Sequence, residues 1–216
     1  MTGYVFDFHG LRLEARGSGA LWWPLGRWLI VADLHLGKSE RLARRGGPLL
    51  PPYEGLATLE RLAAEIALLD PDCVVSLGDG FDDLAAASAL DAQVAAGLAA
   101  LMRGRDWVWI GGNHDPGAPA GLPGHSAESI GLNGVTLRHE AGQGPDISGH
   151  FHPVVRLAGE RRRAFLLGHD HLLLPAFGAY TGGLSHDEPV LRALIPAGLA
   201  IACGSRAMPL PLRRAT

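Results

Sequence analysis

The chain has 216 residues and a mass of 22.8 kDa, which one hydrophobic core can serve, so we expect a single domain over residues 1–216. A hydrophobic fraction of 47% with a charged fraction of 19% excludes an intrinsically disordered protein. The net charge of -3 and a pI near 6.3 exclude a protein that binds nucleic acid through bulk basicity. Any contact with DNA must therefore depend on a local patch or on metal ions.

The two cysteines, Cys73 and Cys203, each lie in an apolar run, which predicts two buried free thiols. This is neither a disulfide framework nor a zinc ribbon. No secretory signal is visible at the N-terminus, and no apolar run reaches the ~20 residues of a membrane helix. We expect a cytoplasmic protein without membrane contact.

The first half of the chain alternates strand and helix patterns. We expect a hairpin of strands 4–8 and 11–15, buried strands at 28–32, 73–77 and 106–110, a short helix at 39–45, and longer helices at 54–69 and 85–102. The order β-α-β-α-β predicts parallel strands joined by right-handed crossovers.

The character of the chain changes after about residue 120. Glycine and proline cut it into short β-like pieces at 134–138, 146–148, 154–157, 163–167, 172–174 and 198–202. Arg161, Arg162 and Arg163 are predicted to form an exposed turn. Together these patterns predict an α/β first half and a β-rich second half that share one core.

Each buried strand of the first half ends in residues that bind metals. The strand ends read Asp33-Leu34-His35, Gly78-Asp79-Gly80-Phe81-Asp82-Asp83 and Gly112-Asn113-His114-Asp115. Sites in open α/β sheets form beyond the carboxyl ends of the strands, so these loops should converge. The second half adds Arg138-His139-Glu140 and Gly149-His150-Phe151-His152.

The residue types favour a pair of divalent cations. Carboxylate, imidazole and amide ligands together suit manganese, iron or zinc, whereas calcium and magnesium prefer oxygen ligands. A metal pair needs one bridging anion, which Asp79 can supply. Each motif is weak by itself, and the strength of the prediction lies in the ordered set.

Some histidines compete for the same roles. His125 is an alternative to His139, but His139 directly follows an alternating strand pattern and His125 lies in a turn context. Gly168-His169-Asp170-His171 repeats the Gly-His-x-His pattern; we prefer His150 and His152 as ligands and interpret 168–171 as a hairpin turn with exposed histidines. His9 and His186 are interpreted as loop histidines.

The ordered set from Asp33 to His152 resembles the calcineurin-like metallophosphoesterases. A closer resemblance is to the bacterial PdeM group, which is associated with an Lhr-type helicase and an ATP-dependent DNA ligase. The stretches that carry it are Val31-Ala32-Asp33-Leu34-His35-Leu36-Gly37-Lys38, Ser148-Gly149-His150-Phe151-His152-Pro153 and residues 174–183. The resemblance implies an α/β fold, a four-layer αββα sandwich with two mixed sheets.

The resemblance also implies roles for single residues. Asp33, His35 and His152 would hold the first metal, Asn113, His139 and His150 the second, and Asp79 would bridge both. His114 would assist the leaving group, and Asp82 would hydrogen-bond and orient His114.

The implied activity is a dinuclear-metal-dependent phosphodiesterase, a DNA endonuclease linked to DNA repair and acting on single-stranded DNA. In this reaction a metal-bridging hydroxide attacks phosphorus. Manganese is the first choice of metal, with iron or zinc as alternatives. A small-nucleotide phosphodiesterase or phosphomonoesterase of the same fold is the alternative function, and a non-catalytic scaffold is a third hypothesis, which the complete ligand pattern disfavours.

Several residues outside the ligand set suit contact with a nucleic acid. Lys38 either meets a substrate phosphate or is a solvated lysine, and Arg41, Arg44 and Arg45 form either a basic patch or a solvated charged face. The five tryptophans are predicted to lie mostly in the core, although Trp22 or Trp23, if exposed, could stack on a base.

Overall fold

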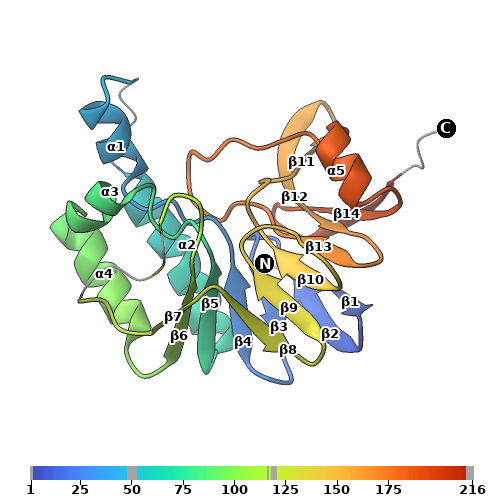
Figure 1. Cartoon of the computed structure of the whole chain (residues 1–216), viewed down its shortest axis with the longest axis horizontal. Helices are drawn as coiled ribbons and strands as arrows, with labels where there is room; N and C mark the ends of the chain where they lie inside the picture. The colour runs from blue at the N-terminus through green and yellow to red at the C-terminus, as the bar shows by residue number, and fades with distance from the viewer. Residues whose placement is uncertain (1, 48–52, 116, 118–120, 213–216) are drawn as a thin grey trace.

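The computed structural model describes residues 2–47, 53–115, 117 and 121–212. Two β-sheets lie face to face, with helices on the outer side of each (Figure 1). Among the described residues, no helix is both long and apolar enough to cross a membrane.

The first sheet has the strand order β1-β2-β3-β4-β5-β6-β7. Its strands are β1 (Tyr4–Phe8), β2 (Leu11–Ala15), β3 (Leu21–Trp23), β4 (Trp28–Val31), β5 (Cys73–Leu77), β6 (Asp106–Ile110) and β7 (His125–Ala127). The pairs from β1 to β4 are antiparallel and those from β4 to β7 are parallel. The sheet is therefore mixed, and its parallel part contains the three predicted buried strands.

The second sheet has the order β15-β14-β12-β13-β10-β9-β8, and β11 pairs with β12 off this path. Its strands are β8 (Ser129–Leu132), β9 (Val135–Arg138), β10 (Asp146–Ser148), β11 (Val154–Leu157), β12 (Glu160–Leu167), β13 (His171–Leu173), β14 (Gly198–Ala202) and β15 (Met208–Leu212). Strand β10 is parallel to β9 and β13, whereas the remaining pairs are antiparallel.

The helices complete four layers. They are α1 (Lys38–Arg44), α2 (Glu54–Leu69), α3 (Leu84–Ser88), α4 (Ala92–Met102) and α5 (Pro189–Leu194). One apolar cluster fills the space between the sheets, a second packs α2 and α4 on the first sheet, and a third packs α5 on the second. The predicted α/β four-layer sandwich with two mixed sheets is confirmed.

Most elements of the first half form where the pattern predicts them. The strands at 4–8, 11–15, 73–77 and 106–110 and the helix at 54–69 have the predicted bounds. The prediction of one helix over 85–102 is wrong, because two helices occupy this range. The side chain of Asp91 caps the second one: it accepts hydrogen bonds from the amides of Gln93 (2.8 Å) and Val94 (3.4 Å), which starts a new helix there.

The prediction of a turn at Arg161–Arg163 is also wrong, since all three arginines lie in β12. The turn lies just before them, at Ala158 and Gly159, which both have positive φ (51° and 85°). Two consecutive residues with positive φ form a tight hairpin turn whose backbone twist matches the twist of the two strands that it joins.

Five short elements, β3, β7, β8, α5 and β15, were not expected from sequence patterns. Strand β15 contains Pro209 and Pro211, which removes the usual strand pattern, and it lies at the edge of its sheet where proline is tolerated. Trp22 and Trp23 are buried, as predicted for core residues, so the condition of exposure for stacking on a base is not met.

Candidate metal centre

The carboxyl ends of β4, β5 and β6 meet at one edge of the first sheet, because these neighbouring strands are parallel. The loops after them hydrogen-bond to each other: the amide of His35 donates to the carbonyl of Asp79 (2.9 Å). The loops after β9 and β10 of the second sheet approach the same edge, and the amide of His150 donates to Asp33 Oδ2 (3.0 Å). All seven predicted metal ligands thus come together from five loops.

Asp33, His35 and His152 form a first group whose ligand atoms lie within 4.8 Å of one another. His152 Nε2 is 3.3 Å from Asp33 Oδ1 and 3.4 Å from His35 Nε2. These are the three residues predicted to hold the first metal.

The second group surrounds Asn113. Asn113 Oδ1 is 2.8 Å from His139 Nε2 and 3.0 Å from His150 Nδ1, and the two ring nitrogens are 3.2 Å apart. Asp79 Oδ2 lies 3.5 Å from His139 Nε2. These residues are the set predicted for the second metal, with Asp79 beside them.

The carboxylates lie between the two groups. Asp33, Asp79 and His139 also have ligand atoms within 4.8 Å of one another, so Asp33 is common to both groups in the structure. Asp79 Oδ1 accepts a hydrogen bond from the amide of His114 (2.9 Å), which leaves Oδ2 facing the ligands. The bridging role of Asp79 stays a prediction.

Backbone and side-chain contacts orient the imidazole rings. His139 Nδ1 lies 3.0 Å from the carbonyl oxygen of Leu77, and His35 Nδ1 lies 3.0 Å from Asp82 Oδ1. A ring nitrogen that donates to such an oxygen leaves the opposite nitrogen with a lone pair directed at the site. Contacts of this kind are typical of histidines that bind metals.

The buried charge of this centre fits divalent cations. Asp33 is fully buried and its Oδ1 has no hydrogen bond in the described part of the protein. Burying a carboxylate without a counter-charge costs several kcal/mol of folding free energy. The imidazole nitrogens that face it need not carry a proton, so they do not necessarily donate a hydrogen bond to it. Cations bound between these ligands would neutralise the carboxylate charge and accept the imidazole lone pairs, so the residues present fit a pair of metals.

The backbone at the centre is in the left-handed region at five of the predicted ligands, Asp33, His35, Asp79, His150 and His152, with φ between 45° and 66°. Such conformations cost about 1–3 kcal/mol each and cluster at functional sites. Glycines allow the close approach: a Cβ at Gly78 would clash with the His139 ring, and one at Gly149 would clash with the Asp33 carboxylate.

His114 lies beside the ligands as predicted, but Asp82 contacts it differently. His114 Nδ1 lies 2.8 Å from the backbone carbonyl of Asp82, and its Nε2 is 4.0 Å from Asp79 Oδ2. The expected contact with the Asp82 carboxylate is wrong, because that carboxylate lies against His35 and Arg41 (2.6 Å). Asp82 orients His114 through its main chain and His35 through its side chain.

The carboxyl group of Asp82 stays ionised. Burial works to raise its pKa, but the contact with His35 and the positive charges of Arg41 and Lys38 outweigh burial and lower it. The pairing with Arg41 was not predicted; the only signal for it in the sequence was the group of arginines after Lys38.

Asp115 differs from its neighbours in its pKa. Burial raises the pKa of Asp115 to about 6, against the effect of hydrogen bonds from the amides of Phe81 (2.6 Å) and Gly117 (3.1 Å). The bond from Phe81 fixes the loop after β6 onto the loop after β5, and the bond from Gly117 lies within the loop after β6.

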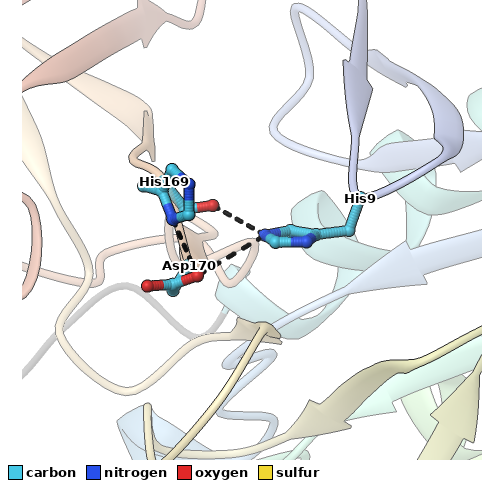
Figure 2. A group of neighbouring side chains, drawn as sticks. All are labelled: His9, His169 and Asp170. Carbon is cyan, nitrogen blue, oxygen red and sulfur yellow. Dashed lines mark hydrogen bonds and ion pairs between the residues drawn. The ribbon is translucent and has the colours of Figure 1, made fainter.

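The competing histidines lie elsewhere. His125 is exposed on β7, and His171 contacts Asp146 (3.0 Å) on the second sheet. His169 Nδ1 lies 2.8 Å from Asp170 Oδ1, and His9 Nε2 lies 2.8 Å from the carbonyl of His169; Figure 2 shows these three side chains. We call them the surface cluster; they join the β1–β2 and β12–β13 turns outside the metal centre.

The arginines of α1 do not form a free basic patch. Arg44 pairs with Glu40 (2.9 Å) and Asp83 (2.8 Å), Arg45 with Asp83 (3.5 Å), and Arg41 with Asp82. Lys38 has no ion pair among the described residues and is partly buried.

The family follows from comparison with known proteins. Residues 26–172 match the family model of the calcineurin-like phosphoesterases, so the chain belongs to this family and is a metal-dependent hydrolase.

The chain is similar to the Pseudomonas putida nuclease MPE, whose crystal structure it matches with a TM-score of 0.77 and 31% sequence identity over 97% of this chain and 100% of that chain. No curated protein sequence gives a significant match.

Proposed function

We propose that this protein is a dinuclear-metal phosphodiesterase that cleaves DNA. The single observation that carries the proposal is the convergence of Asp33, His35, Asp79, Asn113, His139, His150 and His152 at one sheet edge. The similarity to a nuclease along nearly the whole chain favours a nucleic acid as substrate.

Two divalent cations, manganese in the first instance, would be held by the two groups around Asp33 and Asn113. Bound there, they would supply positive charge to the phosphate oxygens and would lower the pKa of water toward 7, so that a nucleophile would be available at neutral pH. His35 and His139 hold their ligand nitrogens in place through Asp82 and the Leu77 carbonyl.

His114 acts on the leaving group. Its Nδ1 is fixed by the Asp82 carbonyl, and its Nε2 faces Asp79 at the edge of the centre with about a third of the side chain exposed. From this position a protonated ring can donate from Nε2 to the departing oxygen. Lys38 supplies a further positive charge for the phosphate backbone.

A single-stranded substrate fits the low overall basicity, because an extended strand can follow a local site without a broad positive face. The place of the enzyme in DNA repair, beside an Lhr-type helicase and an ATP-dependent DNA ligase, is the context that we propose for it.

The test compares single-stranded DNA, duplex DNA, a generic phosphodiester and a phosphomonoester as substrates. Metal-stripped protein is refilled with manganese, zinc, iron or magnesium, and His114→Ala is the matched control. We expect single-stranded DNA cleavage that requires manganese and is lost in the variant. Hydrolysis of the small esters without DNA cleavage would leave the metal centre intact but overturn DNA as the substrate.

A further inference from the structure

An open pocket lies away from the predicted metal ligands. It has a volume of about 370 Å³ and is lined by Gly17, Ser18, Arg61, Arg162, Arg163, Cys203 and Gly204. It forms where the β2–β3 turn, helix α2, strand β12 and the segment after β14 meet. We call it the arginine pocket, because three of its lining residues are arginines and none is acidic.

Two of the three arginines lack a counter-charge. In the described part of the chain, neither Arg61 nor Arg163 forms an ion pair with an acidic side chain. Arg61 Cζ lies 4.5 Å from the centre of the Phe177 ring, and its Nε and Nη2 are buried without a hydrogen bond. By contrast, the buried Arg16 pairs with Glu65 at 2.9 Å.

Burial disfavours the charged form of Arg61 and Arg163. Burial lowers the pKa of Arg61 to about 10, with a further contribution from the nearby Arg163, whose own pKa burial also lowers. Cys203 supplies no counter-charge, because burial raises the pKa of its thiol to about 12. Partly buried cations that repel each other are costly unless an anion binds between them.

We propose that the arginine pocket binds an oxyanion of the phosphate class, held by Arg61, Arg162 and Arg163. Guanidinium groups match the geometry and charge of phosphate oxygens. The Ser18 hydroxyl oxygen accepts from the amide of Ala20 (3.3 Å), which leaves its proton to donate to such an anion. The source is either free phosphate or a phosphate in a nucleic-acid backbone.

Arg163 also connects the pocket to the metal centre. It donates to the carbonyls of Phe177 (3.3 Å) and Gly178 (2.6 Å), whose amides donate to the carbonyls of Ala32 (2.7 Å) and Asp33 (3.0 Å). Replacing Arg163 would therefore disturb a predicted metal ligand. Arg61 makes no such bond and is the better residue to test.

The experiment measures the unfolding temperature of the manganese-loaded protein in inorganic phosphate, against chloride at equal ionic strength. It compares the wild type, Arg61→Gln and, as matched control, Arg156→Gln, an exposed arginine of β11 outside the pocket. Phosphate bound at the metals shifts the unfolding temperature of all three proteins equally. A difference between their shifts therefore reports phosphate binding in the arginine pocket.

We expect the wild type and Arg156→Gln to gain about 3 °C more than Arg61→Gln at saturating phosphate. In chloride, Arg61→Gln should unfold at a temperature no lower than that of the wild type, because a partly buried charge without an acidic partner has been removed. Arg162→Gln, at a less buried lining position, should lose part of the phosphate shift. Equal phosphate shifts in all four proteins would overturn the proposal.

Kinetics with single-stranded DNA and with a small phosphodiester then distinguish the two sources. A backbone phosphate in the pocket predicts a KM for DNA raised several-fold in Arg61→Gln, with the small ester unaffected. Free phosphate as the occupant predicts a lost temperature shift and an unchanged KM for DNA. The unfolding measurement needs no turnover, so it stands or falls independently of the proposed nuclease activity.

Discussion

The metal centre and the surface cluster contain the same kinds of ligand but differ in burial and in how their nitrogens are used. In the surface cluster the His169 side chain is 90% exposed, and its Nδ1 and His9 Nε2 both contact oxygens within the cluster (Figure 2). In the metal centre Asp33 and His35 are buried, and His35 Nε2 faces His152 Nε2.

This difference favours the metal centre over the surface cluster as the site for divalent cations. The polar atoms of the surface cluster contact one another, and water can solvate those that have no partner within the cluster. In the metal centre, carbonyl and carboxylate oxygens contact one ring nitrogen of His139 and of His35, and the opposite nitrogens converge on carboxylates in a buried space. Bound cations would satisfy that arrangement, and the expected effects of substitution decrease from the centre outward.

The largest effect is expected for Asp79→Ala, because this carboxylate lies beside the second ligand group and holds the amide of His114. Activity should fall by about 10³-fold or more, together with the bound metal. Metal content after gel filtration and turnover of a phosphodiester measure the two losses. Full activity in this variant would show that the predicted centre is not the active site.

His114→Ala should lower kcat by about 10²–10⁴-fold, because the proposed proton donor to the leaving oxygen is removed. Metal content should stay at the wild-type value, since His114 is not among the predicted ligands. A substrate with a very acidic leaving group should recover much of the loss, because it needs little protonation. An equal loss with every leaving group would argue against this role.

Asp82→Asn tests the support of His35. The amide removes the charge that lies between His35 and Arg41, so metal affinity or activity should fall by about 10–100-fold. Asp83→Asn is the matched control: Asp83 caps α3 and pairs with Arg44, so its change should lower the free energy of unfolding by about 1 kcal/mol or less and leave turnover intact. Metal titrations should therefore show a lower metal affinity for Asp82→Asn than for Asp83→Asn.

The smallest effect is expected in the surface cluster. The double change His9→Ala and His169→Ala should leave metal content and turnover unchanged and shift the unfolding temperature by less than about 2 °C. Loss of one bound metal per chain in this variant would mean that the exposed surface cluster also binds a metal, which would contradict the distinction drawn between the two clusters.

Sequence patterns predicted the parts of the fold that depend on local residues. Continuous apolar runs marked β5 and β6, and the helical period marked α2, because periodicity reports which face is buried. The break at Asp91 was missed because alanine and leucine continue on both sides of it. Strands β3 and β15 were missed because one is short and the other contains two prolines.

The sequence by itself determined the residue types of the centre and their order along the chain, since ligands follow strands whose ends must meet at one edge. Only the tertiary structure decided that the Asp82 carboxylate contacts His35 and not His114, and that the arginines of α1 are paired with acids. It also brought Arg61 and Arg163 together around one pocket. These contacts join elements distant in the chain, and their geometry depends on packing that no local pattern records.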